Sequence, residues 1–177
     1  MLSVRPFEPA DAPAVLALDT SFTTTSVYVV ARDERGISLT LEQLEAPLTK
    51  RFPLDDLEAP ERSWSDAWVA VVDGSIAGFA ATSFERWNAR LVLWHLYVDP
   101  QLRRRGVARR LLDEVETHAR SLGARHIWLE TSSLNAPGVT VYRALGFELT
   151  GIDLTLYDAT PAEGEVALFF SKPVVLD

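Results

Sequence analysis

Five arginines lie within the eight residues from Arg103 to Arg110, on either side of Gly106. The cluster follows a run of strand-forming residues, Leu91–Val98, and it stands where a helix is predicted to begin. Such a loop leaves backbone N–H groups without partners at the positive end of the helix dipole, which together with the arginines favours a bound anion. We therefore interpret this loop as a pyrophosphate site.

Other phosphate motifs and other site chemistries are excluded by the residues present. The chain has no GxxxxGK[ST] motif, and of the glycines of a dinucleotide fingerprint it has only Gly106. It has no cysteine, which rules out disulfides, cysteine zinc sites, iron–sulfur clusters and thiol nucleophiles. Neither His118 nor His126 has a carboxylate or histidine at ligand spacing, so no metal site is expected.

The elements around the loop predict a βαβ unit. Apolar residues recur at helical spacing from Val107 to Leu122, and Gly123 can adopt the left-handed conformation that ends a helix. The apolar run His126–Thr131 follows. The strands Leu91–Val98 and His126–Thr131 should therefore be parallel neighbours. A second short helix is expected after Asn135, a good N-cap.

The rest of the chain predicts β-structure. Leu2–Glu8 reads as a strand that precedes a short helix, and Ser26–Thr40 reads as a hairpin. A second hairpin turns at Asp73-Gly74. The prolines and acids of 47–61 predict a loop, and a final pair of strands is expected on either side of 158–164.

The size and charge of the chain limit its class. Its 177 residues favour one domain over residues 1–177. No apolar run approaches the roughly 20 residues that span a bilayer, and the first twenty residues do not resemble a secretory signal, so we expect no membrane partner and a cytoplasmic location. The net charge of −8 disfavours nucleic acid and suits a cationic small molecule. A homodimer is left open.

The spacing Arg103-x-x-Gly106-x-Ala108 resembles the Q/R-x-x-G-x-G/A loop of the GNAT N-acetyltransferase superfamily. The Y-x-x-x-G-F element at Tyr142–Phe147 and the position of Asn135 agree with that superfamily. Motifs over nearly the whole chain resemble the streptothricin (nourseothricin) acetyltransferases. These are L-D-x-S-F-T-T (Leu18–Thr24), P-L-T-K-x-F-P (Pro47–Pro53), W-N-x-R-L (Trp87–Leu91), H-I-W-L-E (His126–Glu130), N-A-P (Asn135–Pro137) and L-Y-D-x-T (Leu156–Thr160).

The resemblance implies an α/β fold of the GNAT type. Such a fold has a mixed, mostly antiparallel sheet that splays between two parallel central strands and is flanked by helices. It also implies acetyl transfer from acetyl-CoA, a cosubstrate, to a primary amine of a small molecule such as a streptothricin-like antibiotic. The amine attacks the thioester directly, without a metal.

The resemblance assigns candidate site residues as well. Tyr142 would act as the acid, and we take His95 as the candidate base. The candidates for coenzyme binding are Leu96, Tyr97, Val98, Arg103, Arg104, Arg105, Gly106, Val107, Ala108, Arg109, Asn135 and Tyr142. The candidates for substrate binding are Phe22, Thr23, Trp87, Trp94 and Glu130.

The physics of the implied reaction sets three needs. A primary amine with a pKa near the lysine value of about 10.4 is mostly protonated at neutral pH, so a base must take a proton. The tetrahedral oxyanion needs a preorganised donor, and the resemblance implies that this donor is a backbone N–H at a bulge around Leu96–Val98. The leaving thiolate benefits from a nearby acid, the role that the resemblance gives to Tyr142.

The strand before the loop departs from the streptothricin enzymes, which carry acids there in a pattern like E-D-I. This chain has Trp94-His95-Leu96 instead. Alternation along a regular strand would place His95 on the face of Leu93, and Trp94 on the face of Val92. The residue that would receive the amine is therefore left open.

Several alternatives remain at this point. Tyr142 could be a half-buried aromatic residue, Asn135 an N-cap only, and His95 a core histidine. The protein could acetylate peptides or protein N-termini, or it could bind acyl-CoA without turnover. A nucleic-acid binder is the weakest alternative, because the arginine cluster is short and the net charge is −8.

Overall fold

The computed structural model describes residues 1–176 and divides the chain into two compact units. The first unit consists of Met1–Ser21, Arg51–Trp128 and the C-terminal residues from Pro173. The second unit consists of Phe22–Lys50 and Leu129–Lys172. The single domain over residues 1–177 stays a prediction.

The elements follow the predicted order. The helices are η1 (Pro9–Asp11), α1 (Ala12–Leu16), η2 (Asp55–Leu57), η3 (Pro100–Leu102), α2 (Val107–Ser121) and α3 (Ala136–Ala144). The strands are β1 (Leu2–Pro6), β2 (Ser21–Asp33), β3 (Gly36–Arg51), β4 (Asp66–Val72), β5 (Ser75–Glu85), β6 (Arg90–Val98), β7 (His126–Ser132), β8 (Glu148–Asp153) and β9 (Ala167–Pro173). No helix among residues 1–176 is long and apolar enough to cross a membrane.

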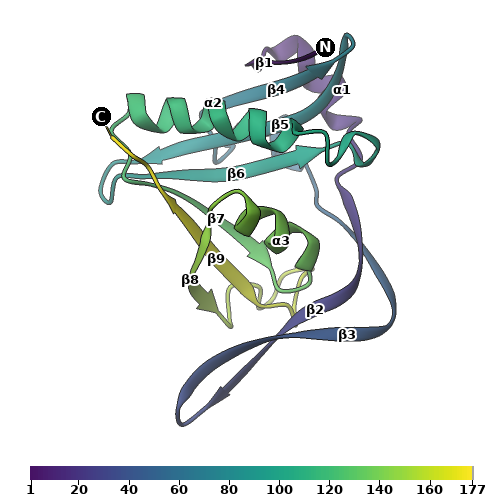
Figure 1. Cartoon of the computed structure of the whole chain (residues 1–177), viewed down its shortest axis with the longest axis vertical. Coiled ribbons are helices and arrows are strands. Elements are labelled where there is room, and N and C mark those ends of the chain that lie inside the picture. The colour runs from purple at the N-terminus through teal and green to yellow at the C-terminus, as the bar shows by residue number, and fades with distance from the viewer. Residues whose placement is uncertain (177) are drawn as a thin grey trace. The chain divides into compact units, whose positions relative to one another are not determined.

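The first unit is an antiparallel sheet in the order β1-β4-β5-β6, continued by the start of β7. Helix α2 runs along the sheet in Figure 1 and buries its apolar stripe, which includes Leu111 and Val115. A second apolar cluster joins Val15 of α1 to Phe79 of β5 and Trp64. Burying such side chains stabilises the fold by about 1.5–3 kcal/mol each, so both faces of this sheet are held firmly.

The parallel pair that the sequence predicts is present between β6 and β7. Arg90–Val92 pairs with His126–Trp128 in parallel, whereas β6 pairs with β5 in antiparallel fashion. The sheet is thus mixed and mostly antiparallel and is flanked by helices. The predicted α/β fold class is confirmed.

A β-bulge in β6 lies earlier than predicted. Thr82 of β5 pairs with Leu93 and Ala81 pairs with His95, so Trp94 is the extra residue. The segment Leu96–Val98, where we expected the bulge, pairs regularly with β5. The sequence prediction was wrong here because a bulge is a backbone feature without a side-chain signature.

The bulge also reverses the predicted faces of the strand. Leu93 lies opposite Thr82, on the face that α2 covers, since a Cβ added at Gly78 of the same β5 face would meet Leu111 of α2. His95 lies opposite Ala81, which belongs to the apolar cluster on the other face. His95 and Leu93 are therefore on opposite faces, not on one face as predicted, because one inserted residue shifts the alternation.

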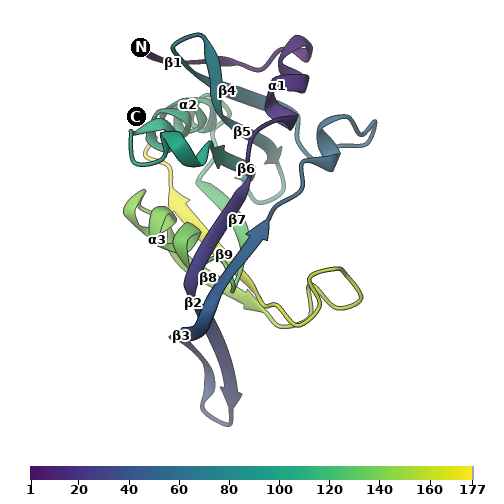
Figure 2. The same cartoon turned by 90° about the vertical axis from the view of Figure 1, so that its right-hand side faces the viewer.

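The second unit contains the long hairpin of β2 and β3, which run side by side in Figure 2. The hairpin predicted over Ser26–Thr40 is present, and its strands extend well beyond these residues. Strand β3 includes Pro47 and ends at Arg51, so the loop predicted from Pro47 begins only after this strand. The unit also holds the end of β7, the antiparallel pair β8 and β9, and α3.

Helix α3 begins at the cap that the sequence predicts. The Asn135 side chain accepts a hydrogen bond from the Gly138 backbone N–H at 3.0 Å and donates to Thr131 Oγ1 at 2.9 Å. Asn135 is buried, with 6% of its surface exposed. A Cβ added at Gly138 would lie 2.2 Å from the Asn135 side chain, so the cap requires glycine at this position.

We predict that Gly138→Ala and Asn135→Ala destabilise the protein through this same cap. Each should lower the free energy of unfolding by about 1–2 kcal/mol, the usual cost of a lost cap. The double variant should cost about as much as the worse single variant, because the second change removes nothing more. Urea unfolding of the native protein, the two single variants and the double variant measures these free energies. A double variant whose cost is the sum of the two single costs would contradict the prediction.

Candidate active site

The arginine loop connects η3 to α2 through two left-handed residues. Gly106, the N-cap of α2, has φ = 81°, and Arg104 has φ = 62°. The left-handed region costs a non-glycine residue about 1–2 kcal/mol. Because this backbone turns the loop into the first turn of α2, its N–H groups and the positive end of the helix dipole lie together, as an anion site requires.

The arginines of the loop make different contacts. Arg103 donates from Nε to the Val98 carbonyl at 3.1 Å and from Nη2 to the Ser21 carbonyl at 2.6 Å. It therefore ties the loop to the end of β6. Arg110 pairs with Asp113 one turn further along α2, at 3.4 Å. Arg104 and Arg105 are exposed and carry the positive charge at the surface of the loop.

His95 is held by a carboxylate that the sequence analysis did not single out. Its Nε2 lies 2.8 Å from Oδ2 of Asp56 in η2, and the same oxygen accepts a hydrogen bond from Trp64 Nε1 at 3.0 Å. The His95 side chain is 11% exposed. Asp56 is 39 residues away in sequence, so only the folded structure shows that it lies beside His95.

Tyr142 is on α3, with its ring 6.1 Å from that of Phe147 and 6.3 Å from that of Phe170. Burial, with a smaller contribution from the negative charge of Glu130, raises the pKa of Tyr142 to about 12. The phenol is therefore protonated at neutral pH and can donate a proton. The structure brings Tyr142 and Glu130 close enough to interact electrostatically.

Glu130 of β7 belongs to a polar cluster of the second unit. Its carboxylate accepts a hydrogen bond from the Tyr157 hydroxyl, and Glu165 nearby pairs with Lys50 and accepts from Ser132. Burial raises the pKa of Glu130, while the Tyr157 hydrogen bond and the charge of Lys50 oppose this shift. Glu130 thus carries a charge that has lost part of its hydration.

The remaining predicted substrate residues occupy different places. In the first unit, Trp87 lies in the turn before β6 and is 84% exposed, and Trp94 is 46% exposed with its Nε1 2.8 Å from Ser83 Oγ. In the second unit, Phe22 is buried in β2, and Thr23 is exposed. The Asn135 amide uses its oxygen to cap α3 and one of its N–H groups to bind Thr131 Oγ1, which leaves one amide N–H for a further contact.

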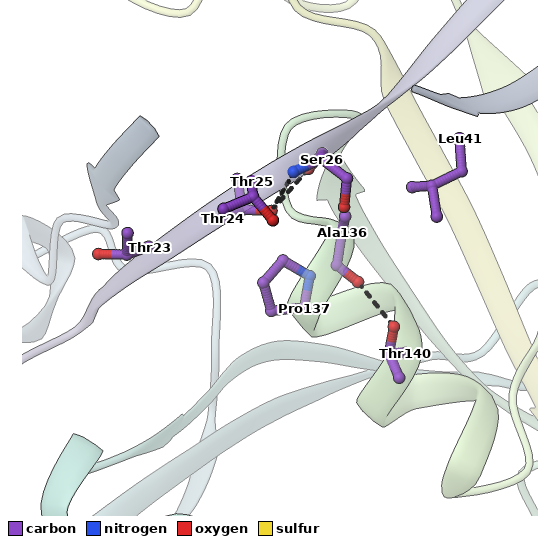
Figure 3. Close-up of a pocket in the computed structure, with 8 residues that line it drawn as sticks. All are labelled: Thr23, Thr24, Thr25, Ser26, Leu41, Ala136, Pro137 and Thr140. Carbon is purple, nitrogen blue, oxygen red and sulfur yellow. Dashed lines mark hydrogen bonds between the residues drawn. The ribbon is translucent and has the colours of Figure 1, made fainter. Parts of the chain in front are cut away.

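Thr23 lines an open groove between β2, β3 and the start of α3 (Figure 3). Hydroxyl groups dominate its wall, and Leu41 and the α3 N-terminus complete it. The lining residues are Thr23, Thr24, Thr25, Ser26, Leu41, Ala136, Pro137 and Thr140. Two of the hydroxyls are engaged locally, since Thr24 donates to the Ser26 carbonyl and Thr140 to that of Ala136.

No group of three or more histidine, aspartate or glutamate side chains within residues 1–176 is arranged to hold a metal ion. The polar chemistry described above therefore consists of an imidazole held by a carboxylate, a protonated phenol, a partly desolvated carboxylate and a basic loop at a helix N-terminus. Each of these can take part in proton transfer or in anion binding.

Comparison with known proteins identifies the family. The acetyltransferase (GNAT) family matches residues 30–147. The streptothricin acetyltransferase of Streptomyces lavendulae is 41% identical over 176 residues, which cover 96% of this chain and 93% of that protein. The chain belongs to the GNAT acetyltransferases.

Two solved acetyltransferase structures agree with this fold. A nourseothricin acetyltransferase crystal structure has a TM-score of 0.89 at 40% identity and covers 98% of this chain and 99% of that one. A Bacillus anthracis protein crystallised with acetyl coenzyme A has a TM-score of 0.82 and the same coverage, and at 24% identity it shares the fold. The GNAT resemblance seen in the sequence is confirmed.

In this acetyltransferase, Arg104 has a left-handed backbone, which glycine adopts without strain. We predict that Arg104→Gly leaves the free energy of unfolding unchanged or raises it by up to about 1 kcal/mol, because relief of strain outweighs the flexibility of glycine. Arg105→Gly removes the same charge at a residue without positive φ, and should destabilise by about 0.5–1 kcal/mol. Chemical denaturation compares the two variants, and equal losses of unfolding free energy would contradict backbone strain at Arg104.

We also predict that Glu130→Gln raises the thermal unfolding midpoint at pH 7, because it removes a partly desolvated charge. Since the pKa of Glu130 is raised in the folded state, the gain should shrink as the pH falls through that pKa and vanish once the carboxyl is protonated in both states. Calorimetry over a pH series measures this. The exposed Glu163→Gln is the control, and a Glu130→Gln protein that is less stable at pH 7 would contradict the prediction.

Proposed function

We propose that this enzyme transfers the acetyl group of acetyl-CoA to a primary amine of a small cationic antibiotic of the streptothricin class. The observation that carries this proposal is the 41% identity, over 96% of the chain, to a streptothricin acetyltransferase. The net charge of −8 is consistent with a cationic acceptor.

The donor half of the proposal rests on the loop at the start of α2. Its N–H groups and exposed arginines suit the pyrophosphate of coenzyme A, with Arg103 acting through the loop backbone that it fixes. The loop candidates are Arg103, Arg104, Arg105, Gly106, Val107, Ala108 and Arg109. The candidates for the pantetheine arm are the backbone of Leu96, Tyr97 and Val98, on the side of β6 away from β5, and the remaining amide N–H of the Asn135 side chain.

The acceptor half of the proposal rests on Glu130 and on the hydroxyl-lined groove. A partly desolvated carboxylate gains most from a cationic partner, and an ammonium group supplies one. Thr23 in the groove would contact polar groups of the acceptor, while Phe22 would support its strand from the buried side. Trp87 and Trp94, both exposed, are the aromatic candidates for the acceptor wall.

In the proposed reaction, two side chains transfer protons to or from the reacting groups. His95 takes a proton from the ammonium group, and the neutral nitrogen forms a bond to the thioester carbon. The tetrahedral intermediate then expels the sulfur, and Tyr142 donates its proton to the thiolate. The amide nitrogen and the His95 imidazolium each lose one proton to solvent, and Tyr142 is reprotonated from solvent. The products are the acetylated amine, coenzyme A and one released proton.

We predict that the enzyme releases coenzyme A from acetyl-CoA with streptothricin as the acceptor. Tyr142→Phe should lower kcat by about 10²–10⁴-fold, the usual contribution of a general acid, and leave the KM of acetyl-CoA within about threefold. Thiol release and product mass measure both effects. Tyr28→Phe is the matched control, because it removes a phenol that accepts a hydrogen bond from Arg143 at 3.4 Å in the same unit, and it should keep kcat.

Two outcomes of this assay would contradict the proposal. Turnover on peptide N-termini with none on small amines would indicate a protein acetyltransferase. Tight acetyl-CoA binding in calorimetry without release of thiol on any amine would indicate a binding protein.

A further inference from the structure

The β-bulge at Trp94 brings His95 to a carboxylate outside its own strand. Without the extra residue, alternation would turn His95 toward α2. With it, the imidazole lies on the other face, where Nε2 is 2.8 Å from Asp56 Oδ2. Trp94 lies on this face too, since its indole donates to Ser83. The contact is thus a consequence of backbone geometry.

The Asp56 carboxylate is itself held in place. Its Oδ2 also accepts the indole N–H of Trp64 at 3.0 Å. Trp64 is 3% exposed and packs edge-on against Phe7 and Phe79. A buried ring cannot move without opening the apolar cluster, so the carboxylate keeps the orientation that receives His95.

This arrangement decides which imidazole nitrogen carries the proton. An ionised carboxylate only accepts hydrogen bonds, so Nε2 of neutral His95 must be protonated, and Nδ1 then presents a lone pair. Nδ1 is buried, and among residues 1–176 no group bonds to it. An unsatisfied buried acceptor costs about 1–3 kcal/mol. His118 Nε2 is also buried without a hydrogen-bond partner among residues 1–176, so it is the Asp56 contact that singles out His95 and leaves the lone pair on Nδ1 that a base needs.

His118 provides a comparison within the same unit. Its Nε2 lies 3.5 Å from Asp66 Oδ2, beyond good hydrogen-bond distance, and its ring packs against Trp68 at 5.1 Å. Asp66 therefore does not fix which nitrogen of His118 carries the proton, whereas Asp56 does so for His95.

We propose that Asp56 is a positioning residue for the acetyl transfer, which holds His95 as the Nε2–H tautomer and offers Nδ1 as the proton acceptor for the amine. This inference rests on the proposed function. In the step, an N–H bond of the ammonium group breaks, and its proton forms a bond to Nδ1. The amine keeps the electron pair, and the resulting imidazolium is paired with the Asp56 carboxylate until it returns the proton to solvent. Asp56 thereby supplies, from η2, the negative charge that the strand itself lacks.

The first test is independent of activity. Nitrogen NMR of ¹⁵N-histidine-labelled protein resolves three histidines, and the His95 signals are those lost in His95→Gln. We expect the neutral ring of His95 to be protonated at Nε2 and bare at Nδ1. In Asp56→Ala this preference should disappear, while His118 should not change. A proton on Nδ1 of the native His95, or an unchanged tautomer in Asp56→Ala, would overturn the proposal.

The second test is kinetic. Asp56→Ala should lower kcat by about 100-fold or more, and Asp56→Asn by less, because the amide oxygen can keep the tautomer but lacks the charge that stabilises the imidazolium. The KM of acetyl-CoA should stay within about threefold. Asp55→Asn, an exposed carboxylate in the same turn, should retain kcat. Thermal unfolding of each variant separates misfolding from loss of positioning.

The two tests distinguish the two proposals. If the native protein acetylates no amine, the proposed function fails, whatever the tautomer. If the native protein is active and Asp56→Asn, folded as the native protein is, keeps full kcat, the proposed function stands and the role of Asp56 fails.

Discussion

The extra residue at Trp94 in β6 is the constraint on which the candidate chemistry depends. It turns His95 away from α2 and toward η2, where Nε2 lies 2.8 Å from Asp56 Oδ2. Bulges locally redirect side chains in this way, and they are frequent next to active sites. One inserted residue therefore converts a histidine that would have packed under a helix into one that is paired with a carboxylate.

The sequence could predict those features that depend on a few consecutive residues, and it could not predict those that depend on residues far apart in the chain. The loop before α2 and the cap at Asn135 depend on a few consecutive residues, and both were predictable. The bulge depends on the pairing of β6 with β5 and has no marker of its own. The contact from His95 to Asp56 spans 39 residues, so strand alternation alone gave the wrong face for His95.

The residues with proposed roles are also those that reduce stability. Arg104 has a left-handed backbone, His95 has an unsatisfied Nδ1, and Glu130 has a raised pKa because it is partly desolvated. Such costs persist where the surrounding structure holds them in place, and they concentrate at functional sites. Here the apolar cluster around Trp64 holds Asp56 beside His95, and the buried stripe of α2 anchors the helix that follows Arg104.

The central claim is that an imidazole fixed by the Asp56 carboxylate of η2 receives the proton of the acceptor amine. The most direct measurement is a crystal structure of the enzyme with coenzyme A and a streptothricin-class amine bound. The account predicts the amine nitrogen within one hydrogen bond, or one bridging water, of His95 Nδ1, and the pyrophosphate on the loop that starts α2. An amine bound away from His95 and contacted by a different base would contradict it.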